Sequence, residues 1–510
     1  MDEKILKVML WGDEVGRLKW DHTKMRGVFT YNPEFIKKGL DIAPLTASIN
    51  SGYGKGENVV GITFRKQNKF TGLPAFIADS LPDSWGKKLT LLWEKEFGME
   101  GRRLSSIDYL AYMGKRAMGA LEFEPDGCPW RQDISVDLGR MARLAEKIFH
   151  QRDSVTLLPE EEWDMAALCS VGTSAGGMQP KAILARNNDT GEIRSGQIMH
   201  DGNWNYYILK FSRADYEQQC ELEMGYHLMA KSAGIDMMPC SLMEVDGKKH
   251  FLTQRYDRMD GEKIHVQTLG AMSPAAESYE DIMEICDELA LPYKEKEQMF
   301  RRMVFNVYAG CTDDHNRNFS FLMNKDGKWH ITPAYDLTFT VSVENGYIQG
   351  DEHELSIRGK YMDITDDDLL CFAKENDIKN AATIMSDVKK AISKVATFLK
   401  QAGVDNKRAE GIDLYLNGQQ HISESLVNLN ERLSEIVIYD DCKSIRCKIN
   451  DVQQMGKTLS LPEQRKIKQL LKDGNSQELN EMKVILAGKY YKQTLNETEE
   501  SMKRNNCFKI

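Results

Sequence analysis

The chain has 510 residues, of which 41% are hydrophobic and 28% are charged, and its formal net charge is −10. A single ordinary hydrophobic core does not grow to this length, so we expect two or more lobes. The composition excludes a largely disordered chain, and the acidic balance argues against a large nonspecific nucleic-acid surface.

The first residues, MDEKILKVML, have neither the basic start nor the apolar core of a signal peptide. No uninterrupted apolar stretch is long enough to cross a bilayer. The ten cysteines are scattered and match no zinc signature. We therefore expect a cytoplasmic protein with reduced thiols and no membrane association.

The N-terminal part of the chain mixes short strands with helices. Apolar runs on both sides of Gly12-Asp13 predict two strands within residues 4–20. Helical periodicity covers residues 84–99, 105–118 and 138–151. We predict an N-terminal subdomain over residues 1–165, which ends in an acidic linker.

A second strand-rich pattern follows over residues 166–258. The runs KAILARN and NYYILK are strand-like, residues 217–235 have helical periodicity, and a hairpin is predicted to turn at Asp246-Gly247. After residue 259 helical patterns dominate, with one further hairpin. We predict a helical lobe over 259–430 and a charged helical extension over 431–510, to which no role is assigned.

Polar side chains gather in GCTDDHNRNFSFL, residues 310–322. Asp313 and Asn318 have the spacing D-x4-N, and Asp336 follows in PAYDL, after a predicted hairpin that would return it to the level of Asp313. Kinases use one Asp to orient the acceptor hydroxyl, and an Asn with a second Asp to hold Mg²⁺. The alternative is that all three side chains only cap turns.

A kinase also needs a lysine on the ATP side with an acidic partner. Lys210 ends the apolar strand NYYILK, and Glu223 on the following helix is the expected partner. Glu221 is the alternative, on a different face of that helix. A strand-end surface lysine would be the simpler interpretation of Lys210.

The segment SVGTSAGGMQPK, residues 170–181, could place backbone donors over phosphates. Gly172 and Gly177 have the G-x4-G spacing, but Met178 stands where a Walker A loop has lysine. A flexible surface loop is the alternative. We expect residues 52–56, GYGKG, to form a turn rather than a dinucleotide loop.

Cys311 and His315 have a possible ligand spacing, but no second pair stands nearby. A zinc site is therefore not expected there. We predict instead that His315 hydrogen-bonds within its loop and fixes the loop's shape.

TDDHNRNFSFL followed by PAYDL resembles the HipA-type serine/threonine kinases, the toxin halves of bacterial toxin–antitoxin modules. The resemblance extends to LPDSWGKKL, TSAGGMQPKAIL, YILKFS, the helix ending LMAKSAGI, and TQRYDR, and it covers roughly residues 1–430. It implies an α+β, two-lobed, protein-kinase-like fold with a large mixed β/α N-lobe and an all-helical C-lobe.

The resemblance also implies roles for individual residues. Asp313 is similar to the family's catalytic base, Asn318 and Asp336 to its Mg²⁺ ligands, and Lys210 to its ATP lysine. Lys181 resembles a second lysine near the phosphates.

Further positions follow from the same resemblance. Gly176 and Gly177 lie in the loop over the phosphates, and Ser174 falls where the family has an autophosphorylated serine. Gln254, Arg255 and Tyr256 occupy the segment between the lobes, where the family holds adenine, and Asp257 is implied to reach the ribose. Gln254 departs from the family, in which an acidic residue is common at this position.

The leading hypothesis is an ATP- and Mg²⁺-dependent protein serine/threonine kinase that acts as a toxin. The family's substrates include aminoacyl-tRNA synthetases, so arrested translation is the implied effect. The implied partner is a HipB-like DNA-binding antitoxin, through which any DNA is contacted. Two alternatives stay open: a small-molecule phosphotransferase, and a catalytically weak corepressor scaffold for the antitoxin.

Overall fold

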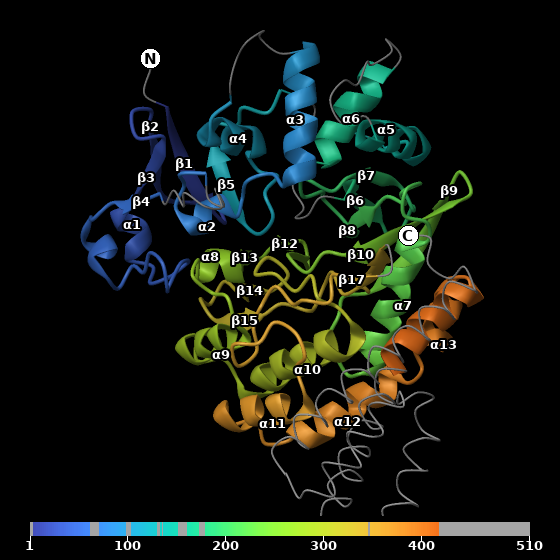
Figure 1. The fold of residues 1–510 in the computed structure, drawn as a ribbon. Helices are drawn as coiled ribbons and strands as arrows, with labels where there is room; N and C mark the ends of the chain where they lie inside the picture. The colour runs from blue at the N-terminus through green and yellow to red at the C-terminus, as the bar shows by residue number, and fades with distance from the viewer. Residues whose placement is uncertain are drawn as a thin grey trace, which may run out of the picture. The chain divides into compact units, whose positions relative to one another are not determined.

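The computed structural model of the chain describes residues 4–61, 71–97, 104–129, 133–134, 136–150, 161–172, 179–344 and 347–417 (Figure 1). Residues 1–341, 349–391 and 398–404 group into one compact unit, which holds every site described below. Among the described residues, 342–344, 347–348, 392–397 and 405–417 group into a second unit. In the described part of the chain, no helix is long and apolar enough to span a membrane.

The first sheet is antiparallel, with strand order β4-β3-β2-β1-β5. Its strands are β1 (Ile5–Leu10), β2 (Asp13–Asp21), β3 (Arg26–Tyr31), β4 (Val59–Val60) and β5 (Leu121–Glu124). β1 has a strictly alternating burial pattern, which is typical of a strand with one face on the core. The predicted turn at Gly12 is confirmed, because Leu10 pairs with Asp13 across it.

Short helices accompany this sheet: α1 (Pro33–Ile36), the 3₁₀ helix η1 (Gly52–Lys55), α2 (Ala75–Ala78) and α4 (Ser106–Met113). The prediction that GYGKG forms a turn is confirmed, since these residues make η1 and end at Gly56 in a left-handed conformation. They therefore form no dinucleotide loop.

The second sheet has the order β7-β6-β8-β10-β9. Its strands are β6 (Lys181–Asn187), β7 (Ile193–Ser195), β8 (Trp204–Lys210), β9 (Cys240–Val245) and β10 (Lys248–Gln254). The hairpin at Asp246-Gly247 is confirmed, and both residues have positive φ, as a two-residue type I′ turn requires.

Helices cover both faces of the second sheet (Figure 1). α3 (Ser84–Phe97), α5 (Leu138–His150) and α6 (Glu162–Gly172) share a buried apolar core with β6 and β8. α7 (Gln219–Ser232) packs against β9 and β10. The sheet is thereby a rigid support for the residues at its strand ends.

The C-terminal half is mainly helical, but it also has a third sheet, ordered β13-β14-β15. The strands are β13 (His265–Thr268), β14 (Ser320–Met323) and β15 (Trp329–Ile331), and the two-stranded ribbons are β11 (Arg258–Met259) with β12 (Glu262–Lys263), and β16 (Ser342–Glu344) with β17 (Tyr347–Gln349). Sequence patterns predict the β14–β15 hairpin, whereas β13 is an additional strand in a lobe expected to be otherwise helical.

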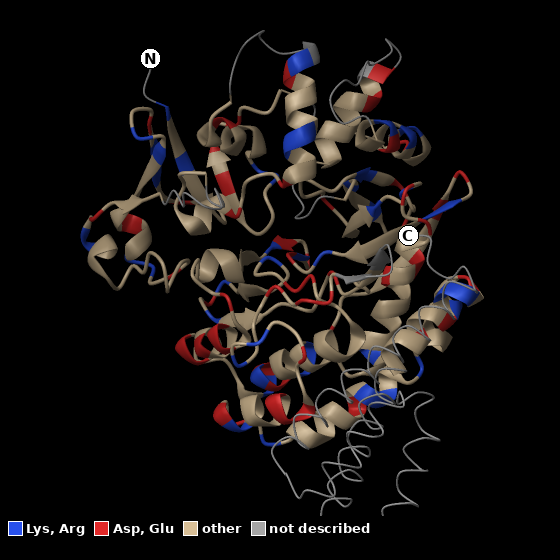
Figure 2. Ribbon diagram, viewed as in Figure 1, with Lys and Arg blue, Asp and Glu red and all other residues tan. Residues whose placement is uncertain are grey.

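The helices of this half are α8 (Leu269–Met272), α9 (Tyr279–Glu288), α10 (Tyr293–Ala309), α11 (Asp366–Glu375), α12 (Ala381–Ile392) and α13 (Val395–Ala402). α9 and α11 are both rich in acidic residues (Figure 2). Both begin with a capping box and carry acids in the first turn, where carboxylates interact favourably with the helix dipole.

Candidate active site

The three polar residues predicted to act together line one pocket. Asp313 and Asn318 lie on the loop between α10 and β14, and Asp336 follows β15. The Asn318 side-chain amide donates to the Asp313 carbonyl oxygen at 2.7 Å, which fixes the loop locally. The β14–β15 hairpin therefore does return the second Asp to the first, as the spacing predicts.

The Asp313 carboxylate is open to solvent, with 63% of its side chain exposed. Partial desolvation raises its pKa, and the negative charge of Asp336 adds to this rise, while His315 opposes it. His315 lies within its own loop and accepts from the Arg317 backbone N–H through Nδ1 at 3.2 Å. The predicted hydrogen bond of His315 within its loop is confirmed, whereas its role in fixing the loop's shape stays a prediction.

Asp314, directly beside Asp313, is an anchor that the motif analysis did not assign. Its carboxylate accepts from the Tyr279 hydroxyl at 2.6 Å, from His353 Nδ1 at 2.8 Å and from the Glu354 backbone N–H at 2.8 Å. The side chain is almost fully buried. These bonds attach the loop to α9 and to residues 353–354.

Lys210, at the end of β8, reaches two acids. Its ammonium donates to Glu223 Oε1 at 2.5 Å and also to Asp336. Burial lowers the pKa of Lys210, but the two carboxylates outweigh it and the net shift is upward. Glu223, rather than Glu221, is thus the partner on α7.

The pKa of Asp336 is shifted in the opposite direction to that of Lys210. Burial raises its pKa, but the charge and hydrogen bond of Lys210, together with the charges of Lys181 and His315, outweigh burial, and the net shift is downward. Asp336 is therefore ionised at neutral pH. Its backbone has φ 58°, the left-handed region that few residues other than glycine adopt, which indicates a position constrained by its surroundings.

Lys181 begins β6 and pairs with Lys210 across the sheet register. Its ammonium lies 3.0 Å from Asp83 Oδ2, and both side chains are buried. Ser174, Gly176 and Gly177, which the sequence places in the loop before β6, lie outside the described residues.

The segment between the second sheet and the C-terminal half holds Gln254 and Tyr256. Gln254 ends β10, is partly exposed, and its backbone N–H donates to the Pro239 carbonyl at 3.0 Å. The Tyr256 ring stacks on Tyr335 with centroids 5.6 Å apart, directly beside Asp336. Tyr256 therefore connects this segment to the pocket.

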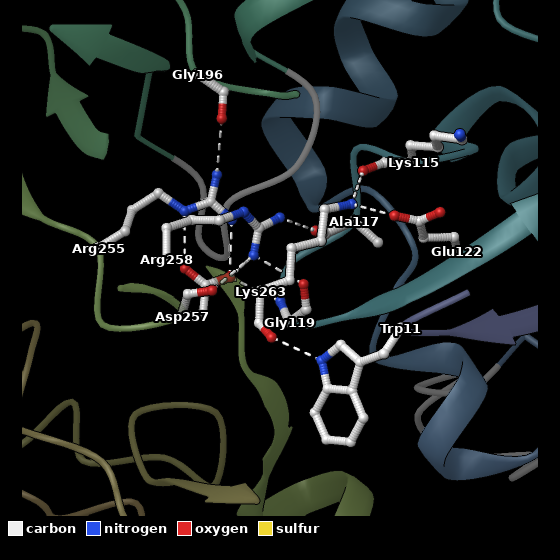
Figure 3. Close-up of polar contacts among 10 residues, drawn as sticks. All are labelled: Trp11, Lys115, Ala117, Gly119, Glu122, Gly196, Arg255, Asp257, Arg258 and Lys263. Atoms are coloured by element: carbon white, nitrogen blue, oxygen red, sulfur yellow. Dashed lines mark hydrogen bonds and ion pairs between the residues drawn. The ribbon is translucent and has the colours of Figure 1, made fainter. Parts of the chain in front are cut away.

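Asp257 does not fit the expectation of a ribose contact. Its side chain is fully buried, and Figure 3 shows its carboxylate paired with the guanidinium groups of Arg255 and Arg258. The Gly119 backbone N–H also donates to it, at 2.7 Å. Burial raises its pKa, but the two arginines outweigh burial and lower it. With both oxygens engaged and none exposed, Asp257 has a structural role in this conformation.

The same network joins the N-terminal subdomain to residues 255–263. Arg258 donates to the carbonyl oxygens of Gly119 at 2.8 Å and Ala117 at 3.0 Å. Lys263 donates to Glu122 at 2.7 Å, and its carbonyl accepts from Trp11 Nε1 at 2.7 Å (Figure 3). The contacts come from residues far apart in the sequence, which explains why no motif predicts them.

Cys311 and His315 lie in different surroundings. Cys311 is buried at the end of α10, whereas His315 is in the loop. Among the described residues, no group of three or more His, Cys, Asp or Glu side chains is arranged to hold a metal ion by itself.

Comparisons with known proteins show which domain types the chain contains. The family model of the HipA N-terminal domain matches residues 6–124, and that of the HipA-like C-terminal domain matches residues 173–400. The serine/threonine-protein kinase toxin HipA of Shewanella oneidensis is 23% identical over 350 residues, which cover 63% of this chain and 72% of that protein.

A Haemophilus influenzae protein is 26% identical over 208 residues, 37% of this chain, and the chain spans only 56% of that relative's length. In the solved structures, Shewanella oneidensis HipA, determined with HipB and operator DNA, aligns with a TM-score of 0.55 and 19% identity. The alignment covers 81% of this chain and 95% of that chain, which shows a shared fold.

The chain thus has the α+β, kinase-like fold, and both domain types of one family occur in it in order. Lys210 pairs with Glu223 and with Asp336, and Asp336 lines the pocket that also contains Asp313 and Asn318. From the two domain matches and the shared fold we conclude that this chain belongs to the HipA-type family of kinases.

Proposed function

We propose that the chain is an ATP- and Mg²⁺-dependent protein serine/threonine kinase of the HipA toxin type. One observation carries the proposal: Asp313, Asn318 and Asp336 line one pocket, while Lys210 joins Asp336 to Glu223. Kinases require this set of groups, and their polypeptide does little covalent chemistry beyond positioning and charge stabilisation.

Each residue has a role in this proposal. Asp313 accepts a hydrogen bond from the substrate hydroxyl that receives the phosphoryl group, and so orients it. The exposure and raised pKa of Asp313 suit this role. Lys210 binds ATP phosphates, and Glu223 holds its ammonium in place. Lys181 supplies a second positive charge on the phosphate side.

The oxygen ligands fit a magnesium ion. The ionised Asp336 carboxylate and the Asn318 amide oxygen would hold it, since Mg²⁺ prefers oxygen ligands. When bound, the ion supplies neutralisation of charge on the phosphates. Backbone groups of residues 254–256 would hold adenine, beside the stacked Tyr256 and Tyr335.

Regulation and partners extend the proposal. The loop with Gly176 and Gly177 would cover the phosphates. A phosphate on Ser174 would add about −1.5 to −2 charges there and repel ATP, as an off switch. The Shewanella oneidensis HipA structure contains HipB and operator DNA. We accordingly propose a HipB-like antitoxin as partner, with DNA contacted through it, and a protein substrate such as an aminoacyl-tRNA synthetase.

Radiolabelled ATP tests this function in a cell extract. Label on protein is expected with wild type, whereas label on a small molecule would instead identify a small-molecule phosphotransferase. Asp313→Ala should abolish transfer and retain ATP binding, and Asp336→Ala should weaken Mg·ATP binding. Asp326→Ala, at an exposed hairpin turn, is the matched control with unchanged activity. Equal loss of nucleotide affinity in both pocket variants would contradict these roles.

A further inference from the structure

The phosphate side of the proposed site has two lysines directly opposite each other. Lys181 on β6 and Lys210 on β8 are paired in the antiparallel register, so their side chains leave the same face of the sheet. Like charges in this arrangement repel each other. Each lysine therefore needs an acid close by: Lys210 has Glu223 in addition to Asp336, and Lys181 has Asp83.

Glu223 and Asp83 come from different parts of the chain. Glu223, on the next helix, pairs with Lys210 at 2.5 Å. Asp83 pairs with Lys181 at 3.0 Å and is separated from it by 98 residues. Asp83 belongs to LPDSWGKKL in the N-terminal subdomain. This subdomain therefore contributes a carboxylate beside β6 and β8, the strands that carry the two lysines.

Asp83 is held firmly enough to position its partner. It precedes α3, and its Oδ1 accepts from the Gly86 backbone N–H at 2.6 Å, as in a helix N-cap. Trp85, at the start of the same helix, donates through Nε1 to the Lys181 carbonyl at 3.2 Å. The α3 N-terminus thus contacts both the backbone and the ammonium of Lys181.

We propose that Asp83 is a positioning residue, which holds the charged Lys181 ammonium beside Lys210 and thereby supports binding of ATP phosphates. This proposal rests on the proposed kinase function. The carboxylate and ammonium are 4% and 2% exposed, and a buried lysine that loses its acid tends to lose its proton. A neutral Lys181 would attract phosphate less.

The pairing itself is tested without nucleotide. Acetic anhydride acetylates neutral amines, and mass spectrometry measures the extent of acetylation at each lysine. Asp83→Asn keeps the acceptor for Gly86 and removes the charge, so labelling of Lys181 should rise about tenfold. Asp83→Ser, which also retains a helix-capping group, is the second variant if Asp83→Asn does not fold.

Asp108→Asn is the matched control. Asp108 also caps a helix, α4, and pairs with a lysine, Lys4, at 2.5 Å. In this variant labelling should change at Lys4 and stay constant at Lys181. Unchanged labelling of Lys181 in both Asp83 variants would overturn the proposal.

The role in ATP binding is tested by kinetics. Asp83→Asn should raise the KM for ATP about tenfold with kcat within about twofold, and should add nothing in a Lys181→Met background, because coupled residues are not additive. A merely structural effect would add to Lys181→Met. An unchanged KM in an active enzyme overturns this inference alone, whereas a wild type without ATP binding overturns the proposed function as well.

Discussion

Asp313 and Asp314 are neighbours in the chain, but their carboxylates have opposite environments: the side chain of Asp313 is 63% exposed and that of Asp314 is 1% exposed. One faces the pocket, and the other accepts hydrogen bonds from Tyr279, His353 and backbone N–H groups. Asp313 is therefore available to a substrate, whereas Asp314 holds the loop in place.

This division predicts the effect of Asp314→Asn. The new NH₂ group cannot accept hydrogen bonds from the donors that face it. The lost bonds should cost about 1–3 kcal/mol of stability and shift the loop. A misplaced reacting group can cost about 100-fold in rate, so phosphoryl transfer should fall by about that factor. Transfer assays and thermal melting measure both effects. Full activity in a destabilised Asp314→Asn protein would show that the anchor does not control the loop.

Glu223→Gln should weaken ATP use, because Lys210 would keep only Asp336 as its acid. We expect kcat/KM for ATP to fall by about tenfold, equivalent to about 1.4 kcal/mol of coupling. Glu221→Gln, two positions earlier on α7, is the control and should leave kcat/KM unchanged. A similar loss in the two variants would mean that the helix, not the ion pair, is responsible.

Asp257→Asn should destabilise the whole fold. It leaves Arg255 and Arg258 buried without their acid, and breaking a buried ion pair costs about 3–5 kcal/mol. Urea denaturation measures the free energy of unfolding.

The control for Asp257→Asn has nearly the same geometry. Arg213 and Asp215 also form two parallel hydrogen bonds at 2.9 and 2.7 Å and are two positions apart, but this pair is partly exposed. Asp215→Asn should therefore cost no more than about 1 kcal/mol. If the two substitutions cost the same, burial is not the source of the effect.

His265 should make the stability fall in mild acid. Burial lowers its pKa from 6.5 to about 4, although its hydrogen bond to the Ile42 carbonyl opposes the shift. Between these pH values the unfolded chain binds a proton that the folded chain does not, so stability decreases as pH falls, by up to about 3 kcal/mol. The difference in unfolding free energy between pH 7 and pH 4.5 should be smaller for His265→Gln than for wild type, and an equal difference would refute the assignment.

Local spacing was sufficient to predict the central part of the site. The D-x4-N motif, the β14–β15 hairpin and the strand-then-helix order of Lys210 and Glu223 each involve residues close in sequence. Residues so close in sequence can adopt few relative positions, so the contacts that the motifs predict are the contacts that the structure shows. The assignment of catalytic and metal-binding roles stays a prediction, as do the domain boundaries.

Long-range partners were not predictable in this way. Asp83 is 98 residues from Lys181, and His353 is 39 residues from Asp314. Many acids in this chain could neutralise a buried lysine, and only the packing of α3 on the second sheet selects Asp83. Asp257 was assigned to a ribose for a related reason, because the sequence does not show that Gly119 and two arginines surround it.

The bond from Gly119 to Asp257 also has a consequence for the order of synthesis. Gly119 leaves the ribosome 138 residues before Asp257 does, as it must in any chain made from its N-terminus. Its N–H and the Gly119 and Ala117 carbonyls therefore lack these partners until Asp257 and Arg258 have been synthesised. Closing so long a loop has an entropic cost that slows folding. We therefore expect nascent chains stopped before residue 255 to be bound by chaperones, and those that include Arg258 to become resistant to protease.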